Sequence, residues 1–121
     1  MAKTERRTEK DLTGLFYDLV YSTDYSDLFT DYLFSINNRF TRSLGLCTTY
    51  EDDWDSPINT IEVSKVLLSC NEKFATNIIL HEMAHVIAYG ECHNKKFYDV
   101  LVEIGGMTKE EEHKMLLAER Y

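Results

Sequence analysis

The segment His81-Glu82-Met83-Ala84-His85 constrains this chain more than any other, because it has the form H-E-x-x-H. Residues four positions apart on a helix lie on one face, one turn apart. Two imidazoles at that spacing can hold one zinc ion, and the glutamate beside the first histidine can reach a water molecule at that ion. This residue set serves metal-assisted hydrolysis, and it makes a zinc-dependent peptidase the leading hypothesis.

The motif is expected in the second half of a long helix. Ser69-Cys70-Asn71-Glu72 has the form of a capping box that opens the helix, and Gly90 is a natural C-terminal cap. The apolar residues between them recur as a helix requires: Phe74, Ile78, Ile79, Met83, Val86 and Ile87.

The remaining segments predict an α+β fold. Residues 1–10 are almost all polar or charged, so we expect a flexible tail followed by a single domain over residues 11–121. Apolar residues at helical spacing predict a first helix over residues 11–22. Alternating apolar and polar residues predict three strands, at residues 32–37, 43–50 and 60–63. Short connections between the strands favour an antiparallel sheet.

Two more helices are expected after the motif. The first follows His93, places Phe97 and Leu101 on one face and ends at Gly105-Gly106. The segment Thr108–Glu111 then resembles a second capping box, which predicts a polar helix at the C-terminal end.

Catalytic zinc usually has three protein ligands, so the motif needs one more. His93 lies eight residues after His85, and a turn at Gly90 can bring it back over the metal. Glu103 is the rival, because some zinc peptidases take a glutamate from a later helix, and Asp99 is a weaker one. We favour one zinc ion per chain held by His81, His85 and His93.

Glu82 is the candidate catalytic residue. Zinc lowers the pKa of bound water from ~15.7 to ~7, so hydroxide is available at neutral pH. Glu82 would act as general base and pass the proton to the leaving amine. The reaction implied is hydrolysis of a peptide bond without a covalent intermediate.

Other residues near the motif have simpler interpretations. Tyr89 and Tyr98 could stabilise an oxyanion, although a packing role is favoured because tyrosines are abundant here. Cys92 could bind a soft metal. His113 lies in the polar C-terminal segment and is expected at the surface.

The composition of the chain indicates which classes of binding partner and which cellular location to expect. The net charge of -8 gives no global attraction for nucleic acid, and the small basic groups around Arg6 and Arg39 are expected to be solvated surface. Three cysteines without paired spacing disfavour a disulfide framework. Neither a membrane-spanning segment nor a signal peptide is recognisable. We therefore expect a protein or peptide substrate and a location in the cytoplasm, of a cell or of an infected host.

Four segments of the chain resemble one known family. They are the basic stretch 39–47, the short strand 60–64, the residues 77–80 before the motif, and Cys92-His93-Asn94-Lys95-Lys96-Phe97 after it. Together they resemble the SprT-like family of zinc metallopeptidase domains. The resemblance implies a minimal, stand-alone zincin-like domain, with His93 as third zinc ligand and Glu82 as catalytic residue. Cys92 and Asn94 depart from the family by replacing the two glycines that flank this histidine.

Two alternative functions stay open. The chain could be a catalytically silent, zinc-stapled module that inhibits or adapts a partner protein. Some SprT-like proteins cleave proteins crosslinked to DNA, so a DNA-associated protease is the second alternative. The latter has weak support, because the extended basic segments and the cysteine-rich element of such proteins are missing here.

Overall fold

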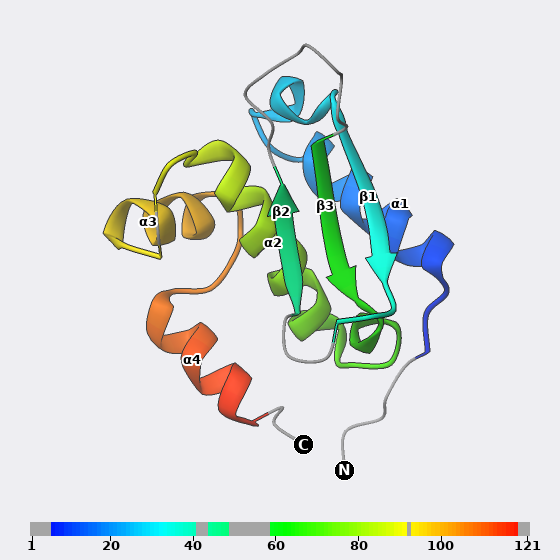
Figure 1. The fold of residues 1–121 in the computed structure, drawn as a ribbon. Coiled ribbons are helices and arrows are strands. Elements are labelled where there is room, and N and C mark those ends of the chain that lie inside the picture. Colours follow the sequence, from blue (N-terminus) through cyan, green and yellow to red (C-terminus); the bar gives the residue numbers. More distant parts are fainter. Residues whose placement is uncertain (1–5, 41–43, 49–58, 92, 119–121) are drawn as a thin grey trace.

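The computed structural model describes residues 6–40, 44–48, 59–91 and 93–118 (Figure 1). The helices and strands follow in the order α1 (Glu9–Tyr21), the 3-10 turn η1 (Ser26–Phe29), β1 (Tyr32–Asn37), β2 (Gly45–Thr48), β3 (Asn59–Ser64), the 3-10 turn η2 (Lys65–Leu68), α2 (Glu72–Ile87), α3 (Lys95–Glu103) and α4 (Lys109–Ala118). The predicted α+β class is confirmed. None of the described helices is both long and apolar enough to cross a membrane.

The sheet is mixed, so the prediction of an antiparallel sheet was wrong. Its strand order is β1-β3-β2, with β3 parallel to β1 and antiparallel to β2. Consecutive strands do alternate in direction, but β3 lies between the first two instead of beside β2 alone (Figure 1). A short connection restricts the direction of the next strand, but it does not determine which strand it will pair with. The sequence therefore predicted the strand directions and not the strand order. The predicted end of the second strand, at residues 49–50, lies outside the described residues.

One face of the sheet is covered by α1 and α2. The register places Phe34, Ile61 and Cys47 in one row across the three strands, and Ile36, Val63 and Gly45 in the next. Ile61 and Val63 of the central strand are fully buried. Burial of such side chains supplies most of the stability of a domain of this size.

The first helix begins two residues earlier in the chain than the sequence predicted. Residues 1–5 are outside the described residues, but α1 already begins at Glu9, inside the predicted tail. Thr8 and Asp11 form a capping box there. The Arg7 guanidinium donates hydrogen bonds to the carbonyl oxygens of Leu67 and Cys70, which anchors this segment beside η2.

The helix α2 carries the motif, but it does not begin at the predicted capping box. Asn71 is the N-cap, and its side chain accepts a hydrogen bond from the Lys73 amide. Ser69 instead ends η2, where its amide donates to the Val66 carbonyl. The helix ends at Ile87, and Gly90 follows in a turn with φ of 87°, a conformation that favours glycine.

Two helices complete the fold, as the sequence predicted. Asn94 caps α3, and Phe97 and Leu101 bury one face of that helix against α2. The predicted capping box of α4 is present, because Thr108 and Glu111 each bond the other's backbone amide through a side-chain oxygen. In this arrangement α2 lies between the sheet and α3, and it contacts both (Figure 1).

Candidate metal centre and active site

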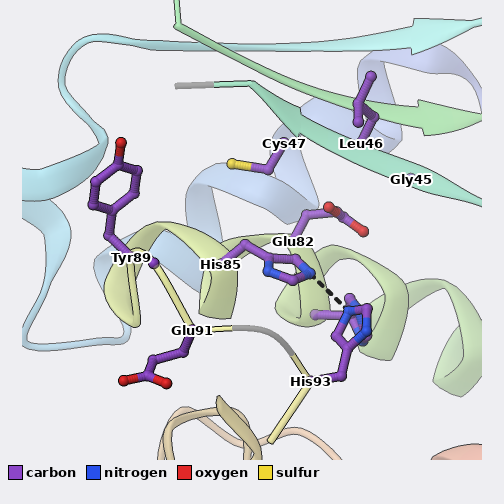
Figure 2. Close-up of a pocket in the computed structure, with 10 residues that line it drawn as sticks. Gly45, Leu46, Cys47, Glu82, His85, Tyr89, Glu91 and His93 are labelled. Carbon is purple, nitrogen blue, oxygen red and sulfur yellow. Dashed lines mark hydrogen bonds between the residues drawn. The ribbon is translucent and has the colours of Figure 1, made fainter. Parts of the chain in front are cut away.

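Three histidines converge at one point. Helix α2 places His81 and His85 one turn apart, and the turn through Gly90 brings His93 back to them. Figure 2 shows the rings of His85 and His93 side by side. The Nε2 atom of His93 lies 3.0 Å from Nε2 of His81 and 3.0 Å from Nε2 of His85. Among the described residues these three form a group whose ligand atoms all lie within 4.8 Å of one another. The structure therefore brings together the three predicted metal ligands.

This arrangement fits a metal better than it fits hydrogen bonds alone. One hydrogen atom on His93 Nε2 cannot make two linear hydrogen bonds at once, so the two 3.0 Å contacts are not both satisfied by neutral rings. Two nitrogens bound at ~2.0–2.1 Å to a tetrahedral zinc ion lie roughly 3.3 Å apart, which is close to the observed spacing. A cation bound by all three Nε2 atoms would satisfy every lone pair.

The electrostatic environment keeps the rings in the form that binds metal. Burial, together with the neighbouring His81 and His93, lowers the pKa of His85 to about 4. Burial and His81 also lower the pKa of His93 below its usual value. Both imidazoles are therefore neutral at pH 7, and a neutral imidazole has the free lone pair that a metal needs.

Glu82 lies beside the histidines and is buried, with 6% of its surface exposed. Burial raises the pKa of its carboxyl group to about 7, with His81 opposing the shift and Glu112 adding to it. The carboxylate faces Gly45 on β2 (Figure 2). A Cβ atom at position 45 would lie 2.7 Å from Glu82 Oε2, so only glycine leaves room for the carboxylate.

A second carboxylate, Glu112 of α4, was missed in the sequence. It is 3% exposed and accepts hydrogen bonds from His81 Nδ1 at 2.9 Å, Asn77 Nδ2 at 2.8 Å and the Tyr98 hydroxyl at 2.9 Å. Burial acts to raise the pKa of this carboxyl group, but the hydrogen bond and charge attraction from His81, with the hydrogen bonds from Tyr98 and Asn77, outweigh it and hold the pKa below its usual value. Glu112 is therefore ionised, and His81 donates through Nδ1.

The sequence analysis did not single out Gly45 or Glu112, but each had a signal in the sequence. Gly45 interrupts a predicted strand, and a glycine inside a strand often marks a close approach of another group. Glu112 lies three residues before Met115 and four before Leu116, so it shares the helix face that packs against the core. A carboxylate on an apolar face is unusual and indicates a buried partner.

The rival ligands lie elsewhere. Glu103 is exposed and accepts a hydrogen bond from the Tyr25 hydroxyl at 2.8 Å, and Asp99 pairs with Lys95 on the surface of α3. His113 is exposed, as expected, whereas Cys92 lies outside the described residues. The Tyr98 hydroxyl is bonded to Glu112. Among the described residues, none of these side chains joins the three histidines.

A cavity of about 480 Å³ opens beside the histidines. Gly45, Leu46 and Cys47 of β2 line one side of it, and residues 89–91, in the turn after α2, line another. Figure 2 shows Tyr89 and Glu91 across from the strand residues. The tyrosine is 56% exposed at the rim. The cavity gives a substrate access to Glu82 and to the point where the three Nε2 atoms meet.

Comparison with known proteins agrees with this geometry. No curated protein and no solved structure matches the chain significantly. The family model described as the SprT-like family matches residues 17–116, which include the motif helix, the sheet and Glu112. That family is associated with zinc and with metallopeptidase activity. With a match over most of its length, the chain belongs to the SprT-like family.

Proposed function

We propose that this protein is a zinc-dependent metallopeptidase that hydrolyses peptide bonds, with His81, His85 and His93 as zinc ligands and Glu82 as general base. One observation carries the proposal. The three histidine Nε2 atoms meet beside a buried carboxylate, and both face an open cavity. A metal, a base and room for a substrate are the parts that metal-assisted hydrolysis needs.

Zinc bound by the three histidines would polarise the scissile carbonyl and acidify a water molecule. Glu82 would take the proton from the attacking water and return it to the leaving amine. In the metal-free chain the pKa of the Glu82 carboxyl group is about 7, so a large part of the population holds a proton at neutral pH. A dication nearby would favour the ionised form of Glu82, which is the form that accepts a proton.

The substrate would be an extended segment of a polypeptide. β2 lies at the edge of the sheet, and its residues 45–47 line the cavity. A peptide that adds to a sheet edge pairs through its main chain, so it is bound largely independently of its sequence. Paired along β2, the peptide would run past Glu82 and the histidines with a peptide bond within their reach.

The main alternative is a zinc-stapled interaction module without catalysis. A structural zinc site usually has four protein ligands and no open position. Here three histidines converge, and the buried carboxylate of Glu82 lies next to them at the cavity. A structural site has no use for that carboxylate, whose burial costs free energy, so the arrangement favours the enzyme.

The substitution Glu82→Gln tests the proposal. It removes the base and keeps the size of the side chain, so we expect zinc content and fold to persist while casein cleavage falls by roughly 10²- to 10⁴-fold. Glu72→Gln is the matched control, because Glu72 is an exposed glutamate on the same helix. Equal cleavage by wild type and Glu82→Gln would refute the mechanism. Zinc binding without cleavage in the wild type would favour the interaction module.

A further inference from the structure

Glu112 joins three helices at the back of the histidine cluster. It lies 31 residues after His81 in the chain, yet its Oε2 atom is 2.9 Å from His81 Nδ1. The same oxygen accepts a hydrogen bond from Asn77 on α2, and the other oxygen accepts one from Tyr98 on α3. A carboxylate buried this deeply is stable only when such donors compensate its charge.

The partners of Glu112 are themselves held in place. Asn77 is 2% exposed, and its Oδ1 atom accepts a hydrogen bond from the Met107 amide at 2.9 Å. This contact fixes which end of the amide faces Glu112, so Asn77 can only donate to it. With donors at both oxygens, Glu112 is an acceptor and the hydrogen lies on Nδ1 of His81.

The tautomer of His81 follows from this geometry. A neutral imidazole has one N–H and one free lone pair, so a hydrogen on Nδ1 leaves the lone pair on Nε2. Nε2 is the atom that faces His93 at 3.0 Å. Glu112 therefore holds the ring in the orientation and tautomer that direct the free lone pair to the shared point of the three histidines.

We propose that Glu112 is a positioning residue for the metal centre, acting through His81 from a helix that contributes no metal ligand. The inference rests on the proposed function, because it assumes that the three histidines bind zinc. Carboxylates that orient a metal-binding histidine typically change metal affinity by 10- to 100-fold when they are replaced. Helix α4, polar in sequence and placed after the motif, would thus be a part of the site.

The first test is the zinc affinity of Glu112→Gln, measured by competition with a chromophoric chelator. We expect a loss of about 10- to 100-fold relative to wild type. Glu110→Gln is the matched control, since Glu110 is an exposed glutamate on the same turn of α4, and it should bind zinc like wild type. The metal-free Glu112→Gln protein should be less stable than wild type, because the three hydrogen bonds to the carboxylate lose the help of its charge, so zinc affinity is measured on protein that circular dichroism shows to be folded. Equal zinc affinity in Glu112→Gln and Glu110→Gln would overturn the inference.

A second measurement uses the wild-type protein and does not depend on a variant that folds. Long-range ¹H–¹⁵N NMR spectra of the zinc-loaded chain should show the His81 hydrogen on Nδ1, with Nε2 bound to the metal. A hydrogen on Nε2, or zinc bound through Nδ1, would contradict the role of Glu112 while leaving zinc binding intact. If the wild type binds no zinc, the proposed function and this inference both fail.

Discussion

Glu82 can occupy its position because the residue opposite has no side chain. Gly45 lies on the inner face of the sheet, in register with the buried Val63, where most strands would place an apolar side chain. The space that a side chain would fill is taken by the Glu82 carboxylate. At the residue scale, the position of the proposed base therefore depends on a strand residue 37 positions earlier in the chain.

Gly45→Ala tests this dependence. The added Cβ would meet Oε2, Cγ and Cδ of Glu82 at 2.7, 2.8 and 2.9 Å, so the whole carboxylate must move. A displacement of ~1 Å in a catalytic group can cost roughly 10²-fold in rate, and we expect a loss of that size in casein cleavage with zinc content unchanged. Gly14→Ala on α1 is the control. A Cβ atom at position 14 would meet no other segment of the described residues within 4 Å, so activity should stay at the wild-type level. Wild-type cleavage by Gly45→Ala would show that the contact does not position Glu82.

The burial of Glu82 also predicts how stability depends on pH in the metal-free protein. The pKa of Glu82 is about 7 in the folded state, against an ordinary value of 4.5, so the folded state retains a proton that the unfolded state has lost between these values. The contribution of Glu82 to the free energy of unfolding therefore falls as pH rises from 4.5 to 7. Glu82→Gln removes this contribution.

The free energy of unfolding of Glu82→Gln minus that of wild type should therefore increase as pH rises from about 5 to about 8. We expect an increase of up to about 3 kcal/mol. Urea denaturation of both proteins in the presence of a chelator measures the difference. His85, with its pKa lowered to about 4, titrates in both proteins, so its own contribution largely cancels. A difference that does not change with pH would contradict the buried, proton-holding state of Glu82.

At the scale of elements, α1 and α4 both begin with a capping box, but the two helices contact different parts of the molecule. Thr8 caps α1 and Thr108 caps α4, each in a capping box with an acidic residue three positions later. α1 covers the sheet, whereas α4 carries Glu112 to His81. Loss of either cap should loosen one helix end by a similar free energy, but only one of the two ends lies at the metal centre.

Thr108→Ala and Thr8→Ala form a matched pair on this basis. Each should reduce the free energy of unfolding by about 1 kcal/mol, the usual cost of losing a threonine cap. Only Thr108→Ala should also weaken zinc binding, because Glu112 lies in the first turn of α4, directly after the lost cap. Urea denaturation and chelator competition measure the two effects. Equal zinc affinity in both variants would show that the start of α4 does not support the site.

The elements that could be predicted from sequence are those with a strong local pattern. The helices α1, α2 and α3 follow from apolar spacing, and the start of α4 follows from Thr108 and Glu111. The order of the strands could not be predicted, because a buried apolar residue such as Ile61 fits a central strand and an edge strand equally well. The partners of Glu112 were also out of reach, since the docking of α4 against α2 is a tertiary event that local pattern does not encode.

At the scale of the whole molecule, the site is assembled from four elements around α2. The sheet provides Gly45 on one side, and α3 and α4 provide Tyr98 and Glu112 on the other. The turn after α2 contributes His93. The motif alone therefore accounts for two of the proposed ligands and for the proposed base, and the fold supplies the proposed third ligand and the residues that hold all of them in place.

The zinc content of the purified chain tests this account most directly. Metal analysis of wild type, His93→Ala and Glu103→Ala compares the proposed third ligand with its rival under the same conditions. We expect one zinc ion per chain in wild type and in Glu103→Ala, because Glu103 is bonded to Tyr25 away from the cluster, and near-complete loss in His93→Ala. Stoichiometric zinc in His93→Ala, or its loss in Glu103→Ala, would contradict the metal centre described here.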